Sequence, residues 1–240
     1  MVDIILNIVE YIGVISFAIS GTVIAINKRA DYVGALFFAL LTCFGGGMIR
    51  DIALGNVPRI LTLTSNYYLA LVCIFVSAIC FTLAFIPKTA SFITKHSHDF
   101  IIEFTDAIGL SVFCVFGVDV AIELGHTNPI LLIFCGCITG VGGGMLRDIC
   151  SAEIPFIFRK HIYLIPALCG TIFYTLTCKH IPHLASLLIA IGIIIGLRVL
   201  AIKFKWNLPV PKGKGDGIKD TSSQNANKEA DTVVPDEARV

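Results

Sequence analysis

The sequence carries the octapeptide GGGMIRDI at residues 45–52 and a near copy of it, GGGMLRDI, at residues 142–149. The two copies lie 97 positions apart, and Pro58 and Pro155 keep that spacing downstream. Self-similarity over such a distance indicates that one structural unit occurs twice in the chain.

The composition around these copies is that of a membrane protein. Hydrophobic residues make up 56% of the 240 residues and charged residues 15%, whereas about 25% of a typical soluble domain is charged. Of the 35 charged residues, 13 follow residue 202, which leaves 22 for the first 202 positions. That is too few to solvate a globular surface of this size. The net charge of +1 gives no reason to expect nucleic acid as a partner, and the expected partner is the lipid bilayer.

Seven apolar segments are long enough to cross a bilayer, which takes about 20 residues. They cover roughly residues 4–26, 33–54, 67–86, 101–123, 129–150, 162–178 and 185–203. Residues 207–240 are polar and lack hydrophobic periodicity, which is typical of a disordered tail. The sequence thus predicts an all-α polytopic membrane protein with seven transmembrane helices.

Basic residues between the apolar segments predict the orientation, because Lys and Arg accumulate on the cytoplasmic side. One side carries Lys28, Arg29, Lys88, Lys95, Arg159, Lys160, Lys203 and Lys205. The other side carries only Arg59 and Lys179. We therefore expect a multi-pass protein of the cell (inner) membrane, with the N-terminus outside and the C-terminal tail in the cytoplasm.

The repeat spans three predicted helices in each half, and an odd number of helices makes the second copy enter the bilayer from the opposite side. We expect a first three-helix repeat at residues 1–97, an inverted second repeat at 98–183, a seventh helix at 184–206 and the tail at 207–240. Inverted repeats are characteristic of transport proteins, whose pathway lies near the midplane between the repeats.

Each repeat places three consecutive glycines inside its second helix. Glycine in a helix costs about 1 kcal/mol relative to alanine, so we expect both helices to break there, which a membrane tolerates only beside protein or a water-lined cavity. Close helix packing, which glycine also permits, is the alternative. The glycines expected to line an ion pathway are Gly45, Gly46, Gly47, Gly142, Gly143 and Gly144.

Charged residues at membrane depth are the other candidate pathway residues, because an unpaired charge there is costly. They are Arg50, Asp51, Arg147, Asp148, Glu10, Asp106, Asp119 and Glu123. Glu10 and Asp106 match at a spacing of 96, whereas Asp119 and Glu123 have no counterpart in the first repeat and could instead form a solvated acidic mouth. We expect each arginine to reach back to backbone groups freed by the helix break. Because Asp119 and Glu123 share its repeat, we expect Arg147 to have the larger functional role.

The remaining polar residues predict no enzyme, metal site or cofactor. The nine cysteines lie in or at the ends of apolar segments, which is typical of small buried hydrophobic residues rather than of a disulfide framework. The spacing of Cys135 and Cys137 does not suit zinc, and the histidines at positions 96, 98, 180 and 183 are interpreted as incidental. No nucleophile elbow, zinc-protease or phosphate-loop motif occurs in the sequence.

The doubled GGGxxRD motif, in the second helix of each three-helix repeat, resembles the prokaryotic branch of the trimeric intracellular cation (TRIC) channel family. The same duplicated domain characterises bacterial proteins described as glycine transporters. The likeness covers residues 1 to about 204. It implies a homotrimer with one pathway in each protomer, lined chiefly by the second and fifth helices. It also implies conduction of monovalent cations, mainly potassium, and an outside N-terminus.

Two transport functions share the features of this sequence. In a passive channel, freed carbonyls and helix ends would replace part of the hydration shell of potassium or sodium, and the arginines would form a barrier or gate. In a carrier for a small zwitterion such as glycine, an arginine and a helix N-terminus would bind the carboxylate. A non-transporting membrane scaffold or enzyme is the third class, and it would need a catalytic pair within the bilayer.

Overall fold

The structure is a computed structural model that describes residues 2–62, 64–86, 98–159, 162–204 and 206. Within these residues the chain forms α-helices and no strand. The helices are α1 (Val2–Asn27), α2 (Tyr32–Ala53), α3 (Arg59–Thr62), α4 (Thr64–Leu83), α6 (His98–Glu123), α7 (Pro129–Cys150), α8 (Phe156–Arg159), α9 (Leu164–Thr177) and α10 (His183–Phe204). The expected disordered tail at 207–240 lies outside the described residues.

Five of the helices in the described residues are long and apolar enough to cross a membrane. They are Ile4–Asn27, Tyr32–Ala53, Ile101–Glu123, Pro129–Cys150 and His183–Phe204. The expected spans at 67–86 and 162–178 contain the shorter apolar helices Tyr67–Leu83 and Leu164–Thr177. The chain is therefore an all-helical multi-pass membrane protein, in which length and composition by themselves identify five of the seven expected spans.

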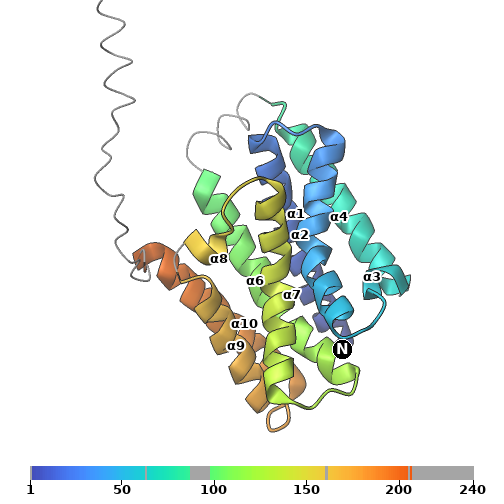
Figure 1. The fold of residues 1–240 in the computed structure, drawn as a ribbon, viewed down its shortest axis with the longest axis vertical. Coiled ribbons are helices and arrows are strands. Elements are labelled where there is room, and N and C mark those ends of the chain that lie inside the picture. The colour runs from blue at the N-terminus through green and yellow to red at the C-terminus, as the bar shows by residue number, and fades with distance from the viewer. Residues whose placement is uncertain (1, 63, 87–97, 160–161, 205, 207–240) are drawn as a thin grey trace, which may run out of the picture. The chain divides into compact units, whose positions relative to one another are not determined.

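The two repeats run in opposite directions (Figure 1). Helices α1, α2 and α4 have the same order as α6, α7 and α9, but each helix of the first set is antiparallel to its counterpart in the second. The second helices of the repeats, α2 and α7, pack against each other, and α10 packs on α9 and α6. This is the arrangement of an inverted repeat with one additional helix.

The central helices α2 and α7 begin at similar caps. The carboxylate of Asp31 accepts a hydrogen bond from the backbone N–H of Gly34 at 2.7 Å, and the side-chain oxygen of Asn128 accepts one from Ile130 at 3.0 Å. These bonds satisfy N–H groups that a helix leaves unpaired at its first turn. Local sequence therefore determines where both helices start.

The expected helix breaks at the glycine triplets are wrong. Helices α2 and α7 continue without interruption through residues 45–47 and 142–144. A Cβ atom on Gly46 would lie 2.0 Å from the carbonyl oxygen of Thr139, and one on Gly143 would lie 2.0 Å from that of Thr42. The glycines let the two backbones touch, and the gain in packing offsets their low helix propensity.

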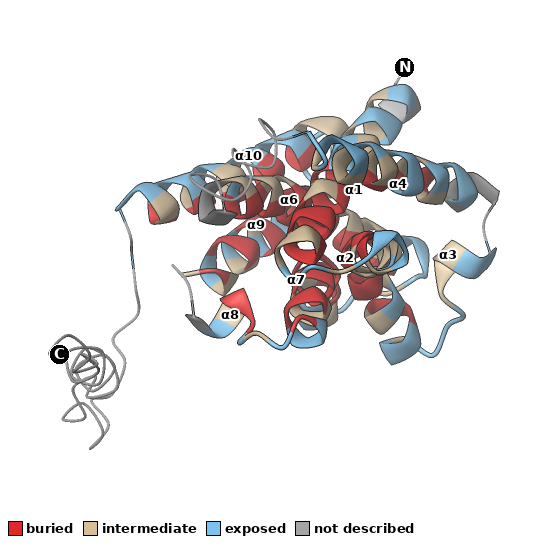
Figure 2. Ribbon diagram, turned by 90° about the horizontal axis from the view of Figure 1, so that it is seen from above, coloured by how far each residue is buried: buried red, intermediate tan, exposed pale blue. Residues whose placement is uncertain are grey.

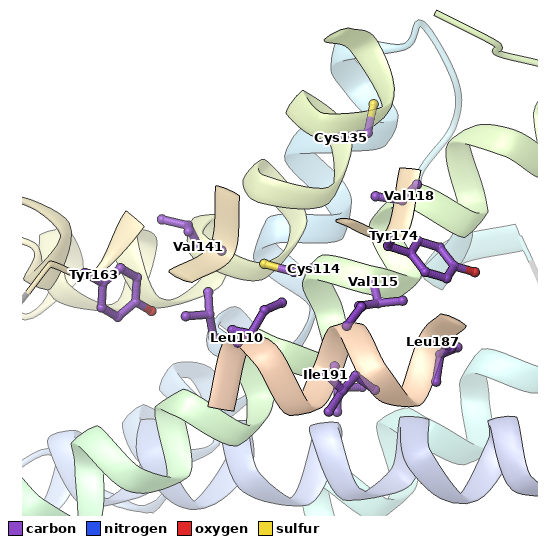
Figure 3. Packing of buried hydrophobic residues seen from close by; sticks show 14 of the residues in the cluster. Leu110, Cys114, Val115, Val118, Cys135, Val141, Tyr163, Tyr174, Leu187 and Ile191 are labelled. Atoms are coloured by element: carbon purple, nitrogen blue, oxygen red, sulfur yellow. The ribbon is translucent and has the colours of Figure 1, made fainter. Parts of the chain in front are cut away.

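Buried residues concentrate where α1, α2, α6 and α7 meet, while the outer faces of the helices are exposed (Figure 2). The larger apolar cluster joins α6, α7, α9 and α10 and includes Leu110, Val115 and Ile191 (Figure 3). Large apolar side chains such as Phe75 and Ile130 lie on the exposed faces. A surface of this kind suits hydrocarbon, because lipid tails are as apolar as the side chains that meet them.

Candidate functional site

A cavity of about 560 Å³ lies between the start of α1, the ends of α2 and α6, and the start of α10. The lining includes Cys43, Phe113 and Thr139, which lie near the middle of α2, α6 and α7. The charged and titratable residues of the lining are Glu10, Arg50, Asp51, Arg59, Asp119, Glu123, Lys179 and His183. Five of these residues were predicted from the sequence as site residues, namely Glu10, Arg50, Asp51, Asp119 and Glu123, and the predicted Gly47 also lines the cavity.

Three contacts between side chains order the rim of the cavity. Arg59 Nη2 lies 3.0 Å from Glu123 Oε2, with the Glu123 side chain 61% exposed. Tyr174 donates a hydrogen bond to Asp119 Oδ1, and His183 Nε2 lies 3.1 Å from Asp119 Oδ2. These contacts tie α6 to α3, α9 and α10 around a mouth that is rich in carboxylates.

Arg50 and Asp51 connect the cavity to the short helix α3. Arg50 donates from Nε and Nη2 to Asp51 Oδ1, at 2.8 and 2.7 Å. The other oxygen, Asp51 Oδ2, accepts a hydrogen bond from the backbone N–H of Arg59, the first residue of α3, at 2.8 Å. Asp51 therefore caps α3 and neutralises Arg50 at the same time.

The second repeat contains the same unit at the opposite end of the bundle. Arg147 Nε donates to Asp148 Oδ1 at 2.9 Å, and Asp148 Oδ2 accepts from the backbone N–H of Phe156, the first residue of α8, at 2.9 Å. α3 and α8 are not among the helices predicted from the sequence. The signal was present, since Pro58 and Pro155 directly precede them at equivalent positions and proline favours the start of a helix.

Arg147 is sealed inside protein, unlike the cavity-lining Arg50. Its Nη1 donates to Asp106 Oδ1 at 3.0 Å and to Ser20 Oγ at 2.5 Å. Tyr163 donates to Asp106 Oδ2 at 2.6 Å. The Arg147 and Asp106 side chains have no exposed surface. We call Ser20, Asp106, Arg147, Asp148 and Tyr163 the sealed cluster.

Phe156 and Arg198 pack against the sealed cluster. The guanidinium carbon of Arg147 lies 5.3 Å from the centre of the Phe156 ring. The guanidinium carbon of Arg198 on α10 lies 4.4 Å from the centre of the Tyr163 ring. The space between Val141, Gly144, Phe156 and Tyr163 leaves no room for a water molecule. The described part of the chain is thus hollow beside Arg50 and filled beside Arg147.

Tyr163 and Arg198 were missed by the sequence analysis. Arg198 is 1% exposed, and it is the only charged residue between positions 184 and 202, which was a usable signal of a buried charge. Tyr163 carried no such signal, because tyrosine is common near the ends of membrane helices.

The larger functional role expected for Arg147 stays a prediction, but the charges are grouped differently from the repeats, and the expected contact of the arginines with freed backbone groups is wrong. Asp119 and Glu123 line the cavity together with Arg50, not with Arg147, because the end of α6 lies beside the end of α2 when the repeats are antiparallel. The arginines contact carboxylates rather than freed backbone groups, because the continuous helices α2 and α7 free none at the triplets. Glu10 and Asp106 hold matching positions in the two repeats but lie in different sites. Glu10 lines the cavity, whereas Asp106 belongs to the sealed cluster.

The sequence model of the family described as "Glycine transporter" matches this chain at residues 7–84 and again at 103–179, once in each repeat. The chain belongs to this family. Its relatives include a UPF0126 membrane protein of Vibrio cholerae, 31% identical over 206 residues that cover 86% of this chain and 82% of the relative. The UPF0126 inner membrane protein YadS of Escherichia coli K12 is 31% identical over 209 residues, which cover 84% of this chain and 93% of YadS.

The fold of this Glycine transporter family member is that of solved TRIC channels. A prokaryotic TRIC channel crystallised in 0.5 M KCl is 33% identical, with a TM-score of 0.74 over 85% of this chain and 99% of the channel. The TRIC trimeric intracellular cation channel orthologue from Rhodobacter sphaeroides is 27% identical, with a TM-score of 0.74 over 84% and 99%. The resemblance seen in the sequence is confirmed, because the similar solved structures are TRIC channels and the sequence relatives are membrane proteins.

Proposed function

We propose that the chain is a channel for monovalent cations, potassium above all, with one pathway inside each protomer. The pathway begins in the cavity, passes the crossing of α2 and α7, and ends at the sealed cluster. The cavity carries this proposal, because its four carboxylates (Glu10, Asp51, Asp119 and Glu123) exceed the three basic residues Arg50, Arg59 and Lys179. A cleft with an excess of one charge raises the local concentration of the opposite ion.

The sealed cluster is the closed end of this pathway. A cation that leaves the cavity meets Arg147, whose guanidinium is held by Asp106 at 3.0 Å and Asp148 at 2.9 Å. Opening requires Arg147 to leave Asp106, and Tyr163 holds Asp106 from its other oxygen. The described conformation is therefore open to one side and shut on the other.

The assembly and orientation follow the resemblance and the charge distribution. We propose a homotrimer in the inner membrane, since the similar solved structures are of trimeric intracellular cation channels and the relative YadS is an inner membrane protein. The excess of basic residues on the side of Lys28 and Lys203 supports an outside N-terminus. In this orientation the cavity faces outward and the sealed cluster faces the cytoplasm.

The test uses purified protein in planar bilayers, with a matched pair of substitutions at the repeat-equivalent positions. Asp106→Asn weakens the hold on Arg147 and should raise the open probability in potassium, because the closed end loses an ion pair. Glu10→Gln removes a carboxylate from the open cavity and should lower the current through one open channel without raising the open probability. Equal effects of the two substitutions on gating would contradict the assignment of the two ends.

Transport of a small zwitterion is the second candidate. A cavity open to one side only is also what alternating access requires, and Arg50 and Arg59 could bind a carboxylate there while Glu10 or Asp119 bound an ammonium group. Glycine uptake into vesicles that saturates, with no unitary current in bilayers, would favour the carrier. Unitary currents far above carrier turnover, unaffected by glycine, would exclude it.

A further inference from the structure

Two cysteines from different helices meet in the middle of the bundle. Cys73 on α4 lies with its sulfur 3.5 Å from the sulfur of Cys43 on α2. The Cys43 thiol in turn donates to the carbonyl oxygen of Val14 on α1 at 3.4 Å. Both cysteines belong to an apolar cluster with Phe17 and Leu69. Neither the proposed transport function nor the charges of the pathway use these thiols.

The two sulfurs differ in access. Cys43 is 5% exposed and lines the cavity, whereas Cys73 has no exposed surface and does not line it. A small uncharged oxidant that enters the cavity therefore meets Cys43 first, and Cys73 only through Cys43. This order, with one reachable thiol and one buried thiol in contact with it, is the arrangement in which a first oxidation product is resolved to a disulfide.

We propose that Cys43 and Cys73 are a peroxide-sensitive modification site that closes to an intramolecular disulfide between α2 and α4. The Cys43 sulfur attacks one oxygen of hydrogen peroxide, the O–O bond breaks, and a sulfenic acid and one water form. The Cys73 sulfur then attacks the Cys43 sulfur, the S–O bond breaks and a second water leaves. The sulfurs give two electrons to the peroxide, and the two thiol protons end in the two waters.

The surroundings suit the product better than the reactive form of the thiol. The sulfurs must approach from 3.5 Å to about 2.05 Å, the length of a disulfide bond. A disulfide is uncharged and apolar, so the cluster around Phe17 accommodates it, whereas a thiolate there lacks solvation. We therefore expect slow formation and a persistent bond. In the proposed orientation the cavity faces the oxidising side of the membrane, where disulfides persist.

The bond would fix the helix that carries Arg50. α2 contacts α7 at Gly46 and ends at the Arg50–Asp51 pair, so a covalent link to α4 restricts the movement of the central crossing. This consequence rests on the proposed channel function, while the modification site itself does not.

The experiment treats the full chain in membrane vesicles with hydrogen peroxide, alkylates the remaining thiols, digests without reduction and identifies linked peptides by mass spectrometry. We expect one linked pair that contains residues 43 and 73, lighter than the two thiol peptides by two hydrogens. Cys73→Ser should abolish the pair and leave Cys43 as sulfenic or higher acids, and Cys43→Ser should leave Cys73 as a free thiol. Cys135→Ser, in the other apolar cluster, should leave the pair intact.

Two results would contradict the proposed modification site. In the first, Cys43 and Cys73 are recovered as thiols while the exposed Cys150 and Cys169 are oxidised. In the second, Cys43 or Cys73 forms a disulfide with a third cysteine. Currents recorded before peroxide, after it and after a reductant then test the coupling, with Cys73→Ser as the control. A bond that forms without changing the current keeps the site and contradicts its coupling to the pathway, and neither result depends on which ion is carried.

Discussion

Arg50 and Arg147 occupy the same position in the two repeats, yet their surroundings give them different roles. Arg147 has two buried carboxylates and one hydroxyl as partners, whereas Arg50 bonds to the neighbouring Asp51 and borders the cavity. Arg147→Ala should lower the free energy of unfolding by about 3–5 kcal/mol, because it strands buried charges. Arg50→Ala should cost clearly less, since water in the cavity can solvate Asp51. Thermal unfolding in detergent compares the two, and equal losses would contradict this difference.

Arg50 is one of three basic residues that line the cavity, and its charge is balanced by Asp51. A fixed positive charge in a narrow path opposes a cation by several kcal/mol at an effective dielectric constant near 20, so Arg50→Ala should raise the unitary current. Arg50→Lys keeps the charge and serves as the control, with a current close to that of the unmodified protein. A lower current in Arg50→Ala, with the protein still assembled, would mean that the arginine supports the structure of the path rather than obstructing it.

At the scale of elements, the crossing of α2 and α7 depends on which glycine of each triplet is replaced. Gly46→Ala would put a methyl group 2.0 Å from the Thr139 carbonyl oxygen, whereas at Gly47 the nearest atom is Arg50 Nη2 at 3.7 Å. We expect Gly46→Ala to cost at least about 1–3 kcal/mol through overpacking. Gly47→Ala should be neutral or gain up to about 1 kcal/mol of helix propensity. The thermal unfolding temperatures of the two variants measure this, and equal temperatures would show that the crossing is not as close as described.

The short helices α3 and α8 occupy equivalent positions in the two repeats. Asp51 caps α3 and Asp148 caps α8, in each case eight residues downstream. These two carboxylates were predicted as pathway residues, and the structure gives each of them a structural partner as well. The residue that follows each proline differs, with Arg59 at the cavity and Phe156 against Arg147. This single difference places the charged side chain of Arg59 at the cavity and the apolar ring of Phe156 against Arg147.

At the scale of the whole molecule, the proposed orientation can be tested through the tail. Ser222→Cys places a thiol in a segment predicted to be cytoplasmic, so an impermeant maleimide should label it in broken cells but not in intact ones. The unmodified protein reports the background from its nine own cysteines. Labelling of position 222 in intact cells would reverse the orientation, and with it the side on which the cavity opens.

The linear sequence was sufficient for the properties that depend on composition and repetition. Few charges in the first 202 residues require a membrane, and a repeat of three helices requires inversion, whatever the side chains contact. The capped starts of α2 and α7 are local in the same way. These properties need no knowledge of which helices pack together.

Contacts between distant segments could not be predicted from the linear sequence. Whether glycine breaks a helix or admits a neighbouring helix depends on the backbone across from it. Here that backbone is at Thr139 for Gly46 and at Thr42 for Gly143, in the other repeat. Which carboxylates share a site with which arginine depends on the antiparallel packing, since Asp119 lines the same cavity as Arg50 and Asp106 bonds to Arg147. A repeat in the sequence implies equal folds but not equal environments, because a few exchanged side chains decide where water enters and where the protein closes.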